Sequence, residues 1–204
     1  MGSTVSSAVP ARAFEVRHLQ LARALFAAIA AVMVTFSPDH SAPVGLSVFS
    51  GFAIATGLVL VLAAWLVYPA GERWPSAVLG LITGIAGMFA GVGPARTTVL
   101  FFVIVIAWAL ISGILEAGVS FRARRRGDTT ARDGLVVGVL TVILGVALLF
   151  VSPQYALQYS IEEAGEFTLT GSVIAVGVFG GYAAIVAVYL GIAAFSPRRD
   201  LPAD

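Results

Sequence analysis

Six long apolar runs constrain this chain more than any other feature of its sequence. A helix that crosses a hydrocarbon core of about 30 Å needs about 20 mostly apolar residues. The runs are continuously apolar and do not alternate with polar residues, as the strands of a membrane β-barrel would. The sequence therefore predicts an all-α integral membrane protein with six transmembrane helices, at Leu19–Phe36, Val44–Val67, Trp74–Val92, Thr97–Phe121, Gly134–Val151 and Thr168–Phe195.

The composition argues against a water-soluble enzyme. Only 11% of the 204 residues are charged and 59% are hydrophobic, whereas a soluble domain carries about 25% charged residues. Cysteine is absent, which excludes disulfides and thiolate metal sites, and His18 and His40 are too few for a multi-histidine metal centre. The common nucleotide-binding, zinc-protease and serine-hydrolase motifs are missing as well. We therefore expect no enzymatic activity, no catalytic residue, no cofactor and no metal.

The arginines predict how the chain is oriented in the membrane. All 12 basic residues are arginine, and the six spans put 11 of them on one side and only Arg96 on the other. The positive-inside rule assigns the arginine-rich side to the cytoplasm, so both termini are predicted to be cytoplasmic. A cleaved signal peptide is the alternative for the first run, but its removal would leave an odd number of spans. Residues 1–18, partly disordered, and 196–204 are then cytoplasmic, and residues 19–195 form one transmembrane domain.

Four of these arginines lie together after the fourth predicted span, at Arg122, Arg124, Arg125 and Arg126. An arginine near a bilayer surface attracts anionic lipid with about 1 kcal/mol. The cluster therefore predicts contact with anionic lipids on the cytoplasmic face. It is too short and too close to a span to indicate nucleic-acid binding, so we expect no nucleic-acid partner.

Recurring landmarks predict an internal repeat. Three odd-numbered spans end on an apolar residue, a small residue and a proline, at Phe36-Ser37-Pro38, Val92-Gly93-Pro94 and Val151-Ser152-Pro153. Gly57 and Gly113 each follow their proline by 19 residues, and Gly181 follows its proline by 28. The spacing predicts three tandem, parallel helical hairpins over about 19–68, 74–121 and 134–195, the third with an enlarged outer loop. Inverted repeats of carriers need an odd number of spans per unit, which argues against a secondary transporter.

Glycine pairs at four-residue spacing are frequent in the third, fifth and sixth spans. Such pairs let helix backbones approach closely in a membrane. They indicate either a homo-oligomer interface or packing within one six-helix bundle, and we favour the second. The pairs are Gly80–Gly84, Gly87–Gly91, Gly134–Gly138 and Gly177–Gly181.

Glu116 is the one carboxylate within an apolar run. An ionisable group inside a membrane is costly, so Glu116 is a candidate functional site. It also lies close to the arginine-rich end of its span, where pairing with Arg23, Arg73 or Arg122 would explain it structurally. Arg23 is the expected partner because it too lies inside an apolar run. We favour the structural ion pair over a role in proton or ligand handling.

The outer loop at 152–167 carries the remaining candidate residues. Tyr155 and Tyr159 are four residues apart and are predicted to lie on one face of an interfacial helix. Repulsion between neighbouring carboxylates favours their protonation at mildly acidic pH, which makes this face a candidate pH-responsive surface. The simpler interpretation, which we favour, is a solvated acidic loop. The titratable residues concerned are Glu162, Glu163, Glu166, Asp39 and His40.

The landmarks resemble those of the HdeD-type acid-resistance membrane proteins, six-span bacterial proteins built from short repeats. The resemblance runs from about Leu21 to Phe195. It rests on Phe36-Ser37-Pro38, Trp74-Pro75 followed by Gly80, Ser112-Gly113-Ile114 followed by Glu116, and Val151-Ser152-Pro153. It implies a bacterial inner-membrane protein associated with acid or envelope stress, without an established enzymatic activity or catalytic residues. The longer acidic loop before the sixth span departs from the pattern.

Two functions remain open. The first is a non-enzymatic structural or accessory membrane protein of the stress response, acting as a homo-oligomer or as a subunit of a larger complex. The alternative is a small proton or solute channel or transporter. A conduit needs several polar residues along its path, whereas the predicted spans offer few, which favours the first. These few are Glu116, Thr83, Ser112 and Thr141.

Overall fold

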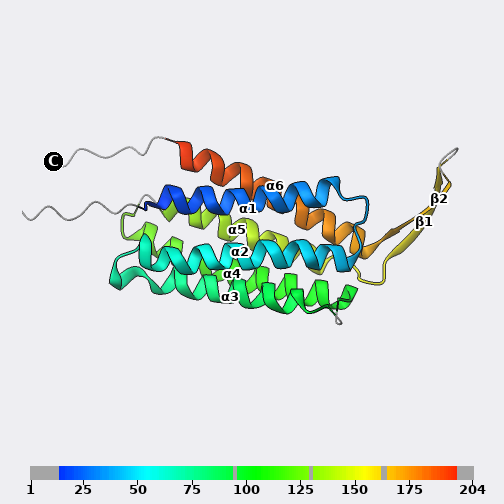
Figure 1. The fold of residues 1–204 in the computed structure, drawn as a ribbon, viewed down its shortest axis with the longest axis horizontal. Helices are drawn as coiled ribbons and strands as arrows, with labels where there is room; N and C mark the ends of the chain where they lie inside the picture. Colours follow the sequence, from blue (N-terminus) through cyan, green and yellow to red (C-terminus); the bar gives the residue numbers. More distant parts are fainter. Residues whose placement is uncertain (1–13, 94–95, 129–130, 162–164, 197–204) are drawn as a thin grey trace, which may run out of the picture.

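The computed structural model describes residues 14–93, 96–128, 131–161 and 165–196. Within these residues, six helices are long and apolar enough to cross a membrane, which confirms the predicted fold class. They lie lengthwise beside one another, and a two-stranded hairpin projects from one end (Figure 1). The elements are α1 Val16–Phe36, α2 Ala42–Leu66, the short 3-10 helix η1 Ala70–Glu72, α3 Trp74–Gly91, α4 Thr98–Arg125, α5 Arg132–Leu149, β1 Ala156–Ile161, β2 Gly165–Thr170 and α6 Gly171–Phe195.

We call the end at which α1, α3 and α5 begin the arginine-rich end, and the opposite end the hairpin end. Helix α1 begins at Val16, three residues before the predicted span, because Glu15 and His18 form a reciprocal capping box. Helix α4 continues past the predicted Phe121 to Arg125, since basic side chains are favourable in the last turn of a helix. Most of the two predicted terminal segments, 1–13 and 197–204, lies outside the described residues.

The helices pack in a closed ring in which extensive and lesser interfaces alternate. Helix α2 makes its most extensive contact with α3, α4 with α5, and α6 with α1. The contacts of α1 with α2, of α3 with α4 and of α5 with α6 are smaller. The pattern recurs every two helices, as three equivalent hairpins would require. The extensive interfaces nevertheless join helices of different predicted hairpins, and the repeat itself stays a prediction.

Glycine allows the backbones to approach at two of the extensive interfaces. A Cβ atom at Gly57 of α2 would lie 2.7 Å from the carbonyl oxygen of Gly80 in α3, and one at Gly113 of α4 would lie 2.9 Å from that of Gly138 in α5. These distances are too short for any side chain, so both positions require glycine. A Cβ at Gly181 in α6, by contrast, would meet nothing within 4 Å.

The predicted glycine pairs therefore divide into two groups. Those on α3 and α5 pack inside the bundle with one exception: Gly87 meets Ile54 of α2 and Gly134 meets Ser120 of α4, whereas a Cβ at Gly84 would meet nothing within 4 Å. The pair on α6, Gly177–Gly181, is exposed and faces open space.

Aromatic side chains fill the core between the hairpin end and the middle of the bundle. Phe49 packs edge-on against Trp108 and Phe179, with ring centroids 5.1 and 5.7 Å apart. Phe52 makes similar edge contacts with the same two rings, and Tyr182 adjoins Trp108. All five side chains are buried. Edge-to-face packing of this kind gives a dense and specifically oriented core.

The predicted interfacial helix around Tyr155 and Tyr159 is wrong, because this segment forms a β-hairpin. Strands β1 and β2 pair antiparallel, with Leu157 opposite Leu169 and Tyr159 opposite Phe167. Apolar and polar residues alternate along both strands, and this period of two matches a strand and not a helix. The predicted start of the sixth span at Thr168 is wrong for the same reason, since residues 168–170 belong to β2.

Helix α6 begins directly after the hairpin. The hydroxyl of Thr170 caps the helix by accepting the backbone N–H of Val173. The backbone N–H of Gly171 donates to the carbonyl of Tyr155 at 2.8 Å and closes the base of the hairpin. The side chains of Leu157 and Tyr159 are exposed.

Candidate functional site

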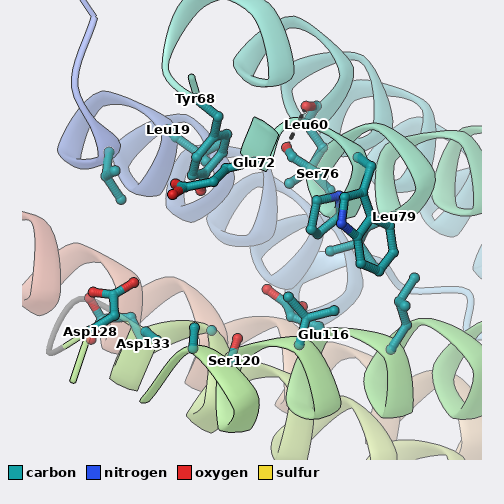
Figure 2. Close-up of a pocket in the computed structure, with 18 of the residues that line it drawn as sticks. Leu19, Leu60, Tyr68, Glu72, Ser76, Leu79, Glu116, Ser120, Asp128 and Asp133 are labelled. Carbon is teal, nitrogen blue, oxygen red and sulfur yellow. Dashed lines mark hydrogen bonds between the residues drawn. The ribbon is translucent and has the colours of Figure 1, made fainter. Parts of the chain in front are cut away.

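A pocket of about 520 Å³ opens at the arginine-rich end of the bundle. Helices α1, α3, α4 and the start of α5 supply most of its lining, together with the connection between α2 and α3 (Figure 2). Its volume is in the range of about 300–1,000 Å³ found for small-molecule sites. Much of its wall is apolar and is formed by Leu19, Leu60, Trp74, Leu79, Leu115 and Val119.

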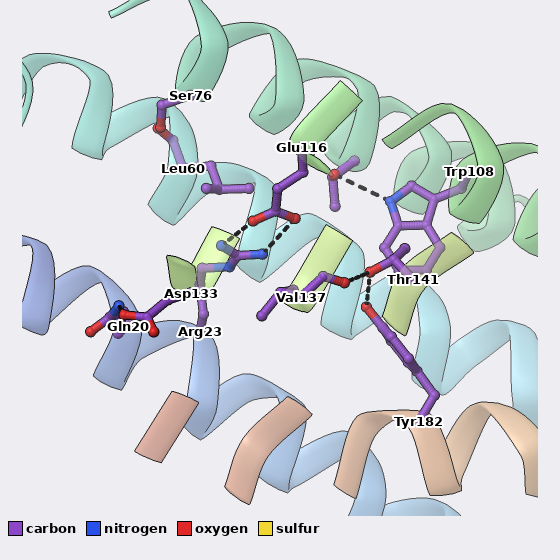
Figure 3. A network of polar contacts seen from close by, with 11 residues as sticks. Gln20, Arg23, Leu60, Ser76, Trp108, Glu116, Asp133, Val137, Thr141 and Tyr182 are labelled. Carbon is purple, nitrogen blue, oxygen red and sulfur yellow. Dashed lines mark hydrogen bonds and ion pairs between the residues drawn. The ribbon is translucent and has the colours of Figure 1, made fainter. Parts of the chain in front are cut away.

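The predicted candidate pair, Arg23 and Glu116, lies in the lining of this pocket. Nη1 of Arg23 donates to Oε1 of Glu116 at 2.7 Å, and Nη2 donates to Oε2 at 3.1 Å (Figure 3). The two side chains are 14% and 10% exposed. A two-pronged contact of guanidinium and carboxylate is the strongest geometry for such a pair. It joins α1 to α4 across the bundle.

The other two arginines considered as partners of Glu116 are placed elsewhere. Nε of Arg73 donates to the backbone carbonyl of Tyr68. Arg122 is exposed in the lining of the pocket.

A second polar group in the pocket was not recognised from the sequence. Nε2 of Gln20 donates to one carboxylate oxygen of Asp133, and the hydroxyl of Tyr189 donates to the other at 3.2 Å. Gln20 is only 4% exposed, and its Oε1 has no hydrogen-bond partner. A usable sequence signal exists on α1, where Gln20 and Arg23 are three residues apart and so share a helix face. Asp133 gave no such signal because it precedes the predicted fifth span.

Several polar residues deeper in the bundle bond to neighbouring helices or to their own helix, whereas the buried hydroxyl of Thr56 has no partner among the described residues. The hydroxyls of Thr141 and Tyr182 lie 2.8 Å apart and join α5 to α6. Nε1 of Trp108 donates to Thr83 at 3.2 Å and joins α4 to α3. The hydroxyl of Ser112 donates to a backbone carbonyl of its own helix. Apart from Thr56, each of these side chains is thus satisfied within the protein.

The arginine cluster continues helix α4 out of the bundle. Arg122, Arg124 and Arg125 lie in the last turn of α4, and Arg126 is its C-cap residue. All four are exposed, and the guanidinium of Arg125 stacks on the ring of Phe121 at 4.6 Å. The predicted lipid contact remains a prediction, and the structure adds that Arg122 and Arg126 also line the pocket.

The candidate pH-responsive residues that the structure describes, Asp39, His40 and Glu166, are not linked to one another. The carboxylate of Asp39 accepts the backbone N–H and the hydroxyl of Ser41. Glu166 is exposed in β2, opposite Ser160. Among the described residues no hydrogen bond or ion pair links Glu166 to Asp39 or His40, while Glu162 and Glu163 lie outside that part of the chain. The described residues also form no cluster of three or more metal-ligating side chains.

Comparison with known proteins yields one match. Residues 85–150 match a family described as a short repeat of unknown function, DUF308. The matched segment begins inside α3 and includes all of α4 and α5. No curated protein and no solved structure matches the chain. About a third of the chain is thus similar to the DUF308 short repeat, and this segment lies within a bundle of apolar helices.

Proposed function

We propose that this chain is a non-enzymatic bacterial inner-membrane protein of the HdeD type, with a structural or accessory role in resistance to acid or envelope stress. HdeD-type proteins carry the DUF308 repeat that matches α3 to α5 here. The arginine distribution supports an orientation with the arginine-rich end in the cytoplasm. The exposed glycine pair on α6 is compatible with action as a homo-oligomer or as a subunit of a larger complex.

The observation that carries the structural role is the Arg23–Glu116 pair. Both oxygens of Glu116 accept hydrogen bonds from the same guanidinium. A two-pronged contact of this kind fixes the two side chains relative to each other. Its direct effect is to hold α1 against α4, two helices that share no extensive interface.

Packing beyond this pair argues against a conduit. The lining of the pocket comes from the half of the bundle at the arginine-rich end. Between Glu116 and the hairpin end lie the buried aromatic rings of Phe49, Trp108 and Phe179. A water-filled path needs polar groups along its length, and such groups are scarce among the described residues there.

The second candidate function is a small proton or solute channel or transporter. It is favoured by the position of Glu116 in the lining of a pocket at one end of the bundle. The hydrogen-bonded hydroxyls of Thr141 and Tyr182 lie near the Arg23–Glu116 pair (Figure 3). Opening of a path through the bundle would then require the rings of Phe49, Trp108 and Phe179 to move apart.

Two measurements test the proposed function. A strain that lacks the gene is expected to survive acid challenge less well than the parent, and both wild-type protein and a fully folded Glu116→Gln variant should restore survival. The purified protein in liposomes loaded with a pH dye should give no proton flux above that of empty liposomes, at acidic or neutral outer pH. Flux that is abolished by Glu116→Gln would replace our proposal by the conduit.

A further inference from the structure

Gln20, one of the residues that line the pocket, carries a buried hydrogen-bond acceptor with no donor. Oε1 of Gln20 lacks a partner, and the side chain is 4% exposed. The neighbouring carboxylate fixes the amide orientation, because a rotated amide would point its oxygen at Asp133. A buried acceptor of this kind is satisfied when a donor from outside the protein reaches it.

The acidic and basic side chains that line the pocket also do not balance. The described lining contains four acidic residues and three arginines. Arg23 is paired with Glu116, whereas Asp133 accepts its two hydrogen bonds from neutral groups, Gln20 and Tyr189. No arginine nitrogen of the described residues lies within 4.0 Å of the Asp133 carboxylate. An unbalanced negative charge therefore lies beside the unpaired oxygen of Gln20.

The unpaired oxygen of Gln20, the charge of Asp133 and the apolar wall together indicate which kind of ligand fits the pocket. We propose that the pocket binds a small organic cation, a protonated amine with an apolar body. The ammonium group donates to Oε1 of Gln20 and to Asp133, and the body packs against Leu79, Leu115 and their neighbours in the wall. A metal ion does not fit, because the described residues gather no three ligands in one place. An anion does not fit the inner part, because Arg23 there is bonded to Glu116.

Two sources can supply the ammonium group. One is a soluble amine that enters from the aqueous side. The other is the headgroup of an aminophospholipid, since the pocket opens at the end of the spanning helices. The shared chemistry is a protonated amine, and lipid composition separates the two sources.

The test uses the full-length protein in nanodiscs of phosphatidylcholine and phosphatidylglycerol, which contain no primary amine. Phenethylammonium is the probe, and 2-phenylethanol and phenylacetate are its neutral and anionic counterparts, with binding measured by titration calorimetry. Saturable binding of the cation, weaker binding of the alcohol and no binding of the anion are expected. Asp133→Asn and Gln20→Met should each weaken binding of the cation about ten-fold. Asp39→Asn, the same acid-to-amide change at the hairpin end, should leave it unchanged.

The inference is overturned if phenylacetate binds as tightly as the cation, if no ligand shows saturable binding, or if both pocket variants bind like wild type. Should either variant fail to fold, the comparison of the three probes on the wild-type protein still tests whether the pocket binds a cation. Adding phosphatidylethanolamine to the nanodiscs distinguishes the sources. Weaker apparent binding of the probe identifies the lipid headgroup as the competing occupant, and unchanged binding identifies a soluble amine.

Discussion

Arg23 and Glu116 are 93 positions apart in sequence and form a two-pronged ion pair at 2.7 and 3.1 Å. The pair is nearly buried and lies within the apolar part of helices α1 and α4. Its net contribution to stability is small when both partners are present, because burial of the two charges offsets their attraction. Replacing only one of the two residues by a neutral one lowers the stability strongly, since the remaining buried charge is then left without a partner.

Glu116→Gln is therefore expected to lower the free energy of unfolding by about 3 kcal/mol or more, and Arg23→Gln by a similar amount. Unfolding in mixed micelles, followed by circular dichroism, measures both. The double variant Arg23→Leu with Glu116→Leu should be more stable than either single variant, because no buried charge is left alone. Single variants as stable as wild type would show that the pair is not formed in the membrane.

Gly57→Ala should destabilise the bundle by about 1–3 kcal/mol, because its Cβ would lie 2.7 Å from the carbonyl oxygen of Gly80. Gly181→Ala is the matched control, since a Cβ there meets nothing within 4 Å. It should be neutral or slightly stabilising, as alanine favours a helix over glycine. Thermal unfolding of both variants in one detergent gives the comparison, and equal effects would contradict the close approach of α2 and α3.

Tyr182→Phe removes the hydroxyl that contacts Thr141 at 2.8 Å. The expected loss is about 1 kcal/mol, the usual net value for one hydrogen bond. It is not larger because Thr141 keeps its bond to the carbonyl of Val137. Tyr155→Phe, at an exposed tyrosine beside the hairpin, should leave the unfolding curve unchanged. A loss as large for Tyr155→Phe as for Tyr182→Phe would argue against a specific bond between α5 and α6.

The hairpin can be tested by cross-linking, since the chain has no cysteine of its own. Gln158→Cys with Thr168→Cys replaces two directly paired residues and should oxidise to a disulfide under mild conditions. Tyr159→Cys with Thr168→Cys is the control, because these side chains point to opposite faces of the two strands. Protection from thiol alkylation, read by mass spectrometry, distinguishes the pairs. Equal cross-linking of both would support an irregular loop.

The orientation proposed from the arginines is tested in intact cells with single cysteines at opposite ends. Gln158→Cys should react with a membrane-impermeant maleimide added outside, after the outer membrane has been made permeable. Arg124→Cys should react only once the inner membrane is opened as well. Both residues are exposed, so burial does not limit either reaction. The reverse pattern would place the arginine-rich end outside.

The sequence predicts the six long helices and the Arg23–Glu116 contact between two of them. The Gln20–Asp133 contact and the hairpin could not be predicted in the same way. Apolar length alone determines that a segment spans a bilayer. Arg23 and Glu116 could be paired because isolated charges inside apolar runs need each other. Asp133 borders its span, where an acidic residue is ordinary, so its contact with Gln20 depends on the packing of α1 beside α5. The four-residue spacing of Tyr155 and Tyr159 predicts a helix. The alternation of apolar and polar residues around Tyr159 indicates a strand only once a second strand is available to pair with it.

The closed ring of helices also determines when the protein can complete its fold. Helices α2 and α3, and likewise α4 and α5, follow one another along the chain, so each pair can associate soon after its second member is inserted. Helix α1 has its extensive interface with α6, which follows the other five long helices of the described residues along the chain. During synthesis α1 therefore remains without its main neighbour until α6 has been made. A chain truncated before Gly171 would leave that face of α1 to lipid or to another protein, which makes the first helix the expected contact point for assembly factors.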